Sequence, residues 1–262
     1  FPKQIAVNAP LAAGGGSERN AVPMYSFAQW RAINHRVLTM PIRSSALRSL
    51  GAHCNVFASE SMMDEIAIAQ GADPLEFRLR HLTDPRARAV LQTSADMALW
   101  TTRKDKQLEG QGMGLACTRY KNTGAYCAVV AKVDAGKDLR VTKLWIAVDV
   151  GLVINADGVV NQIEGGAIQT VSWVLKEAVQ FDSTRIQSTA WDTYPILRFS
   201  EVPQVEVQVI HRPDQPSLGA GEATHGPVAA AIANALFDAL GVRVRDMPLT
   251  TEAITKAAMA AQ

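Results

Sequence analysis

Residues 219–227 read Gly219-Ala220-Gly221-Glu222-Ala223-Thr224-His225-Gly226-Pro227 and lead directly into an apolar segment, 228–240. Pro227 suits the first turn of a helix and Gly241 is a stop signal, so the pattern predicts a helix over this segment. Glycine lets a backbone or a ligand approach closely, and Glu222 is the one carboxylate among these glycines. It is either a firmly mounted catalytic base or a residue that caps or neutralises the helix start. This segment alone favours the second interpretation.

The composition is that of an ordinary globular protein. The chain has 262 residues, 48% hydrophobic and 19% charged, which is enough for one large domain or two smaller ones. A formal net charge of +1 gives no electrostatic reason to expect nucleic acid as a partner. The longest apolar run, from Val228, is interrupted by Asn234 and Asp238, so no membrane span is predicted. No signal peptide is recognised, which leaves open the cytoplasmic or the periplasmic side of a bacterial membrane.

Cysteine and histidine spacing predicts no metal held by this chain's own side chains. The three cysteines, Cys54, Cys117 and Cys127, form no C-x-x-C pair, which argues against a local zinc or iron–sulfur site. We expect them to be buried free thiols. The five histidines also lack the spacing typical of metal ligands.

The order of the segments predicts a mixed α and β protein. Apolar periodicity and Asp-Pro caps predict helices over 55–70, after Asp73-Pro74, after Asp84-Pro85 and over 161–176. Short β-branched runs predict strands over 126–133, 141–150 and 202–210. Residues 1–25 are expected to be irregular, with a close-approach loop at Gly14-Gly15-Gly16-Ser17. A polar segment, 101–110, predicts a division into domains 1–105 and 106–262.

Several common enzyme signatures are excluded. A dinucleotide fingerprint starting at Gly219 would need a third glycine at Thr224, and one starting at Gly110 would need it at Leu115. The phosphate-loop and nucleophile-elbow patterns are also missing from the sequence. Isolated polar residues beside glycines remain, and such loops suit a pocket for a large polar ligand. They are Arg19, Arg48 with Gly51, Gln162 with the pair Gly165-Gly166, and Gly221-Glu222. The glycine pair within a predicted helix indicates a close contact with another segment.

In this order the segments resemble the C-terminal part of the molybdopterin-binding subunit of the xanthine dehydrogenase and aldehyde oxidase family of molybdenum hydroxylases. The resemblance spans residues 15–250 and is greatest to bacterial members of the nicotinate dehydrogenase and isoquinoline oxidoreductase type. It implies an α+β fold made of mixed α/β molybdenum-cofactor-binding domains. The matching segments are Leu47-Arg48-Ser49-Leu50-Gly51, Glu60-Ser61-Met62-Met63-Asp64-Glu65-Ile66-Ala67, Gly71-Ala72-Asp73-Pro74-Leu75-Glu76-Phe77-Arg78, Asn161-Gln162-Ile163-Glu164-Gly165 and Gly221-Glu222.

The resemblance implies a role for each matching residue. Glu222 matches the family's active-site base, and Gln162 matches a glutamine near the pterin and the metal's oxo ligands. Arg48 matches the arginine of a glycine-rich loop against the pterin, a loop usually reading R-G-F-G-G. Here Leu50 replaces the aromatic residue on the substrate side, and Arg19 has the spacing of a substrate-orienting arginine. The remaining cofactor-binding positions implied are Gly51, Gly165 and Gly221.

The same resemblance implies the chemistry and the partners. The family oxidises an electron-poor carbon of an N-heterocyclic aromatic or an aldehyde with oxygen derived from water. Since arginine suits a carboxylate, we expect a nicotinate-like small-molecule substrate. The implied cofactor is molybdopterin with molybdenum, in the cytosine dinucleotide form. The implied partners are the N-terminal portion or a companion chain of the molybdenum subunit, an iron–sulfur small subunit with [2Fe-2S] clusters, and a flavin or cytochrome subunit. We expect this chain to be one piece of that larger subunit.

Two other classes of function stay open at the level of sequence. A non-catalytic relative would keep the fold as a scaffold without the metal. A hydrolase or lyase would pair Glu222 with His225, although three residues' spacing in a glycine-rich loop does not require the two side chains to meet.

Overall fold

The central element is a four-stranded mixed sheet. The computed structural model describes residues 4–5, 15–35, 37, 39–42 and 46–260. The strands lie in the order β3-β4-β5-β6, with the first three antiparallel and β6 parallel to β5. Their bounds are β3 Gln111–Arg119, β4 Tyr126–Asp134, β5 Arg140–Asp149 and β6 Gln204–Val209. The three predicted strands are confirmed, whereas β3 was not predicted. A separate two-stranded pair joins β1 (Gln4–Ile5) to β2 (Thr39–Met40).

All the predicted helices are present. Their bounds are α1 Ala52–Ala69, α2 Pro74–His81, α3 Pro85–Met97, α4 Ala156–Leu175 and α5 His225–Leu240, followed by α6 Thr251–Ala260. Among the described residues, short 3-10 helices cover Trp100–Lys106, Tyr120–Asn122 and Phe199–Glu201. The predicted start of α4 at residue 161 is wrong, because Asn155 accepts a hydrogen bond from the Gly158 amide at 2.8 Å and starts the helix earlier.

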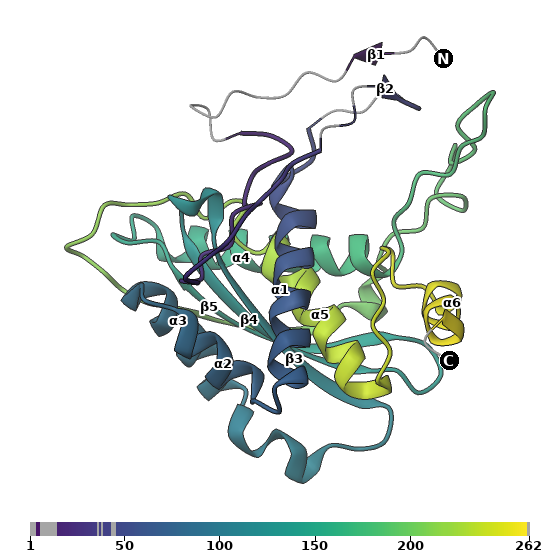
Figure 1. The fold of residues 1–262 in the computed structure, drawn as a ribbon. Helices are drawn as coiled ribbons and strands as arrows, with labels where there is room; N and C mark the ends of the chain where they lie inside the picture. The colour runs from purple at the N-terminus through teal and green to yellow at the C-terminus, as the bar shows by residue number, and fades with distance from the viewer. Residues whose placement is uncertain (1–3, 6–14, 36, 38, 43–45, 261–262) are drawn as a thin grey trace.

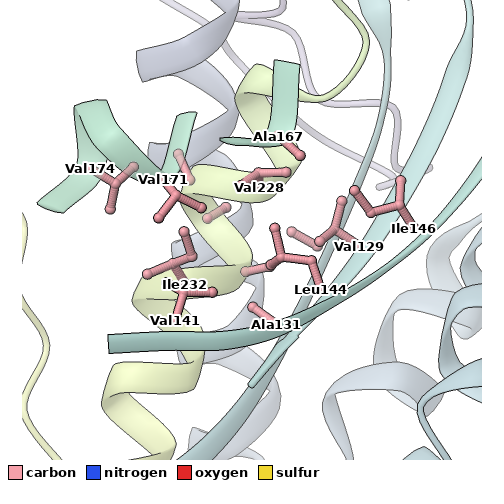
Figure 2. Packing of buried hydrophobic residues seen from close by; sticks show 14 of the residues in the cluster. Val129, Ala131, Val141, Leu144, Ile146, Ala167, Val171, Val174, Val228 and Ile232 are labelled. Atoms are coloured by element: carbon pink, nitrogen blue, oxygen red, sulfur yellow. The ribbon is translucent and has the colours of Figure 1, made fainter. Parts of the chain in front are cut away.

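Helices cover both faces of the sheet (Figure 1). Helices α4 and α5 lie on one face, and α3 lies on the other, while α1 packs along α5. Strand β4 serves both layers, since Val129 faces one hydrophobic cluster and Val130 the other. Figure 2 shows the first cluster, where Leu144 and Ile146 of β5 meet Val171 of α4 and Ile232 of α5. Burial on both faces explains why these strands read as nearly continuous apolar runs.

Two glycines in β3 allow α5 to lie directly on the sheet. A Cβ atom at Gly112 would meet the backbone of Ala235, and one at Gly114 would lie 2.5 Å from the carbonyl oxygen of Ala231. These glycines remove the apolar alternation that marks a strand, which is why the sequence did not predict β3. The far end of α5 is as predicted, since Gly241 closes it in the left-handed conformation.

Some expectations for the thiols and for the N-terminal region need correction. Cys117 and Cys127 are buried free thiols, but Cys54 is exposed, because it lies on the outer side of α1. The N-terminal region was expected to be irregular, yet it contains β1. In the predicted loop at 14–17, Gly14 lies outside the described residues, and Gly15 adopts a left-handed conformation. The domain boundary near residue 105 stays a prediction. In the part of the chain that is described, no helix combines the length and hydropathy needed to cross a bilayer.

Candidate active site

The candidate site lies where the N-terminal ends of α1 and α5 come together (Figure 1). The loop before α1 carries Arg48 and Ser49, and the loop before α5 carries Glu222. Hydrogen bonds join the two loops, because the Ser49 amide donates to Oε1 of Glu222 at 2.6 Å. Gln162, on the second turn of α4, is linked to both loops through Arg48. Residues separated by more than 100 positions in the sequence are thus brought together.

Glu222 is held by tertiary contacts and not by the helix that follows it. Its Oε2 accepts a hydrogen bond from the Tyr120 hydroxyl at 2.6 Å, and Arg19 Nη1 lies 4.0 Å from the same oxygen. The N-cap of α5 is Thr224, which makes no side-chain cap bond. Within the described residues this carboxylate therefore makes no capping hydrogen bond to α5, while its neutralising the helix start stays an open alternative. Its side chain remains 32% exposed, which leaves lone pairs accessible from outside the protein.

The surroundings of Glu222 favour its ionised form. Burial raises the pKa of this carboxyl, but the opposing contacts are stronger in sum. The hydrogen bonds from Tyr120 and the Ser49 amide, with the positive charges of Arg19 and Lys121, lower the pKa of Glu222 below its ordinary value. At neutral pH the group is a carboxylate that can accept a proton.

Arg48 fixes the orientation of Gln162. Its Nε donates to the carbonyl oxygen of Gly221 at 2.5 Å, and its Nη2 donates to Oε1 of Gln162 at 2.9 Å. Because arginine can only donate, the amide atom facing Arg48 must be oxygen. The amide nitrogen of Gln162 is then directed elsewhere. This side chain is exposed, and among the described residues no acceptor for that nitrogen is seen. Gln162 therefore presents two hydrogen-bond donors to the outside of the protein.

The two glycines of the pair in α4 have different surroundings. A Cβ atom at Gly166 would collide with the side chain of Thr224 and lie 3.1 Å from the His225 ring, so α4 and the start of α5 touch there. The predicted close contact is confirmed at this position. Gly165, by contrast, is exposed, and apart from the backbone of its own helix no atom of the described residues lies within 4 Å of the place a Cβ would take. The face of α4 that carries Gln162 one turn earlier is therefore free of side-chain bulk at Gly165.

Gly51 is required for contact between the loop before α1 and residues 15–17. Its amide donates to the Gly16 carbonyl at 3.1 Å, and a Cβ at this position would lie 2.6 Å from that oxygen. Beside it, Ser49 and Leu50 both have positive φ, at 78° and 50°. Left-handed backbone costs about 1–2 kcal/mol per non-glycine residue, and such strain concentrates at functional sites. Here it aims the Ser49 amide at Glu222.

Arg19 is buried rather than directed into open space. Only 6% of its surface is exposed, its Nη1 donates to the Tyr120 hydroxyl at 2.5 Å, and its Nη2 donates to the Gly15 carbonyl at 2.8 Å. This geometry favours a role in supporting Tyr120 over contact with a substrate. Leu50 is half-buried in the loop beside Ser49. The substrate-binding roles of Arg19 and Leu50 stay predictions.

His225 does not form a catalytic pair with Glu222. The ring is fully buried, and its Nε2 lies 3.1 Å from Oε1 of Gln169. Burial, reinforced by the positive charge of Arg48, lowers the pKa of His225 to about 3, so the ring is neutral at pH 7. No hydrogen bond joins the two side chains within the described residues. The hydrolase or lyase alternative therefore lacks the geometry that it needs.

An open groove borders Gln162 and Gly221. Its volume is about 320 Å³, and apolar side chains such as Leu152 and Val159 form part of its wall. Asn155 and Ser217 add polar groups. An apolar hollow with a few polar groups at its edge is the usual form of a ligand site.

Tyr120 and Ser49 were missed by sequence reasoning. Tyr120 directly follows β3. Because the glycines of β3 kept that strand from being predicted, no sequence pattern indicated that Tyr120 lies at the end of a strand. Ser49 contributes its backbone amide, which no residue type could have indicated. The available signal for this loop was Arg48, the neighbour of Ser49 in the glycine-rich motif.

Comparison with known proteins places the chain in a family. Two family profiles match, both described as a molybdopterin cofactor-binding domain, one over residues 56–203 and the other over residues 14–82. The chain belongs to this molybdopterin cofactor-binding family. The resemblance to molybdenum hydroxylases is thereby confirmed.

Two relatives are similar over most of this chain. A nicotinate dehydrogenase chain of Pseudomonas putida is 39% identical over 255 residues, covering 92% of this chain and 21% of the relative. The β chain of isoquinoline 1-oxidoreductase from Brevundimonas diminuta is 39% identical over 207 residues, covering 78% of this chain and 26% of the relative. The present chain thus spans about a fifth to a quarter of the length of these relatives.

The fold is shared with a solved oxidoreductase. Quinoline 2-oxidoreductase from Pseudomonas putida 86 superposes with a TM-score of 0.72 at 14% identity, over 82% of this chain and 53% of that one. This likeness confirms the predicted α+β class of the cofactor-binding domains.

Proposed function

We propose that this chain supplies the proton-accepting part of a molybdenum hydroxylase. The observation that carries the proposal is the convergence of Glu222, Gln162 and Arg48, from three separate elements, beside an open groove. The family assignment supports it, because the two matched ranges include Arg48 and Gln162, while the role of Glu222 comes from the sequence resemblance.

The residues present fit a molybdopterin cofactor. Its oxygen-rich groups need hydrogen-bond donors, and the outward amide of Gln162 supplies two of them. Gly165 leaves open space on the same face of α4, and a Cβ at Gly221 would lie 3.6 Å from Oε1 of Gln162, its one such neighbour within the described residues. Gln162, Arg48, Gly51, Gly165 and Gly221 would hold the cofactor, which we propose to be the cytosine dinucleotide form. When bound, it would supply the two-electron oxidation of an electron-poor carbon.

Glu222 is the base in this proposal. Its carboxylate accepts the proton that water loses as its oxygen is transferred to the substrate carbon. A positioned general base contributes about 10²–10⁴-fold in rate. The Ser49 amide and the Tyr120 hydroxyl hold both carboxylate oxygens, so the carboxylate does not have to be reoriented during the reaction.

The proposed substrate is an N-heterocyclic aromatic of the nicotinate type, or an aldehyde. The names of two relatives, a nicotinate dehydrogenase and an isoquinoline oxidoreductase, support the first class. Electrons would leave to an iron–sulfur small subunit with [2Fe-2S] clusters, and from there to a flavin or cytochrome subunit. The remaining part of the molybdenum subunit, whether an N-terminal portion or a companion chain, would complete the pocket.

Elemental analysis tests this proposal directly. The protein is purified gently with the chains that accompany it, and molybdenum and iron are measured per complex. We expect molybdenum together with about two or four irons per complex, as one or two [2Fe-2S] clusters would supply. An intact complex without molybdenum would overturn the proposal and favour the non-catalytic scaffold.

A further inference from the structure

The hydrogen bond between Tyr120 and Glu222 has a fixed direction. Arg19 Nη1 donates to the Tyr120 oxygen at 2.5 Å, and a guanidinium has no lone pair with which to accept. The phenol must therefore use its own proton elsewhere. It donates that proton to Oε2 of Glu222, at 2.6 Å. Arg19 also lies 4.0 Å from the same carboxylate oxygen, so the three groups form one connected unit.

The turn that carries Tyr120 is built to hold the ring in place. The Tyr120 amide donates to the carbonyl of Ala125 at 2.9 Å, and the next two residues, Lys121 and Asn122, are both left-handed, with φ of 57° and 58°. The side chain of Asn20 bridges this turn, accepting from the Lys121 amide and donating to Oδ1 of Asn122, each at 2.8 Å. Asn20 follows Arg19 directly in the sequence. One short segment therefore fixes both the backbone and the hydroxyl of Tyr120.

We propose that Tyr120 is a positioning residue for Glu222: its hydroxyl, directed by Arg19, holds the carboxylate in one orientation and in its proton-accepting form. The inference rests on the proposed role of Glu222 as a base. Tyr120 acts through Glu222 and has no separate contact with substrate in this proposal. The Ser49 amide fixes the other oxygen, so Tyr120 determines how the carboxylate plane is turned.

The sign of the effect follows from the groups around the carboxylate. The hydroxyl of Tyr120 is one of the contacts that lower the pKa of Glu222. When the hydroxyl is removed, burial still raises the pKa of Glu222, and fewer contacts remain to lower it. The pKa of Glu222 must then rise. Because a protonated Glu222 cannot accept a proton, activity is lost at a higher pH than in the unaltered protein when the pH is lowered. Among the described residues, the charged and titratable groups on the segments around Glu222 include Arg19, Arg48, His53, Tyr120, Lys121 and His225.

Tyr120→Phe tests this inference, because it removes one oxygen and keeps the ring. The matched control is Tyr194→Phe, since Tyr194 also donates to a glutamate, Glu177, at 2.8 Å, far from Glu222 in the sequence. The carboxyl of Glu222 is titrated by infrared difference spectroscopy in the complete purified complex, with Glu222→Gln in each background identifying its band. The same samples give the pH profile of kcat/KM.

We expect Glu222 in Tyr120→Phe to protonate about one pH unit higher than in the unaltered protein, which corresponds to losing one hydrogen bond to a charged group. The acid limb of kcat/KM should move by the same amount, whereas the plateau at higher pH should change less. Tyr194→Phe should leave both unchanged. If Glu222 is protonated at the same pH in Tyr120→Phe as in the unaltered protein, the inference is overturned.

The two proposals fail separately. The infrared titration needs no turnover, so a complex without molybdenum would overturn the proposed function while the titration still decides the role of Tyr120. If Tyr120→Phe does not fold, Asn20→Ala keeps both the phenol and the charge of Arg19 and removes the side chain that bridges the Tyr120 turn. The same upward shift in the pKa of Glu222 is then expected, and its absence would contradict the inference.

Discussion

The Tyr120 hydroxyl and Oε2 of Glu222 lie 2.6 Å apart, although 102 positions separate the two residues in the chain. This bond connects the end of β3 to the loop before α5. The Ser49 amide, from the loop before α1, occupies the other carboxylate oxygen. Three elements therefore determine where one carboxylate points, and the rest of the site can be tested by changing the groups around it.

Arg19→Ala should lower turnover of an acidic and of a neutral heterocycle by the same factor. The reason is that the guanidinium donates to Tyr120 and to the Gly15 carbonyl, so its loss disturbs Glu222 whatever the substrate. Steady-state kcat/KM for nicotinate and for quinoline measures the two factors. A loss confined to the acidic substrate would instead assign Arg19 to the substrate carboxylate, as the sequence resemblance implies.

Gly165→Ala should make the folded chain more stable but reduce its molybdenum content. Alanine in a helix interior is about 0.5–1 kcal/mol more favourable than glycine, and a Cβ here meets no atom of the described residues within 4 Å outside the backbone of its own helix. The same methyl group would enter the space proposed for the cofactor. Thermal unfolding and molybdenum analysis of the purified complex check both halves. Full molybdenum content would exclude Gly165 from the cofactor contact.

Gly114→Ala should destabilise the protein by at least about 1–3 kcal/mol, the usual cost of overpacking a core. The new methyl would collide with the backbone of α5 at Ala231, and backbone atoms can move little. Urea denaturation measures the difference in the free energy of unfolding. Gly165→Ala is the matched control, since the same change in open space should have the opposite sign. Equal stability of Gly114→Ala and the unaltered protein would contradict the close packing of α5 on β3.

Asp149→Asn should cost about 3 kcal/mol at pH 7, and the cost should disappear in acid. Burial raises the pKa of Asp149, but hydrogen bonds from Arg86, from the Gly151 amide and from Arg212 outweigh it and lower the pKa below its ordinary value. A lowered folded-state pKa gives stability that is present above the unfolded pKa and lost as pH falls through the folded one. Urea denaturation across pH 7 to pH 2 should show the two proteins converging.

The control for this change is Asp214→Asn, at an exposed aspartate. It should follow the unaltered protein at every pH. A difference between Asp149→Asn and the unaltered protein that stays constant into strong acid would show that ionisation of Asp149 does not contribute to stability.

The parts of the fold with local signals could be predicted from the sequence. Helices α2 and α3 were found because Asp73 and Asp84 accept hydrogen bonds from the first amides of each helix, each at 2.9 Å to the second residue along. Strand β3 was missed because Gly112 and Gly114 serve the approach of α5, a tertiary requirement that has no local pattern.

The candidate site divides in the same way. Glu222, Gln162 and Arg48 could be predicted as site residues because they stand in recognisable motifs beside glycines. Tyr120 could not be found, since its role depends on the turn that Asn20 bridges from elsewhere in the chain. The buried position of Arg19 was equally invisible, because spacing along the chain does not say whether a guanidinium faces a ligand or another side chain.

The most direct test of Glu222 as the base is Glu222→Gln in the complete complex, beside Glu252→Gln at an exposed glutamate of α6. Turnover and molybdenum content are measured on the same samples. We expect Glu222→Gln to keep its molybdenum and to lose turnover by about 10²–10⁴-fold, while Glu252→Gln keeps both. Unchanged turnover in Glu222→Gln, with molybdenum retained, would contradict the assignment of Glu222 as the base.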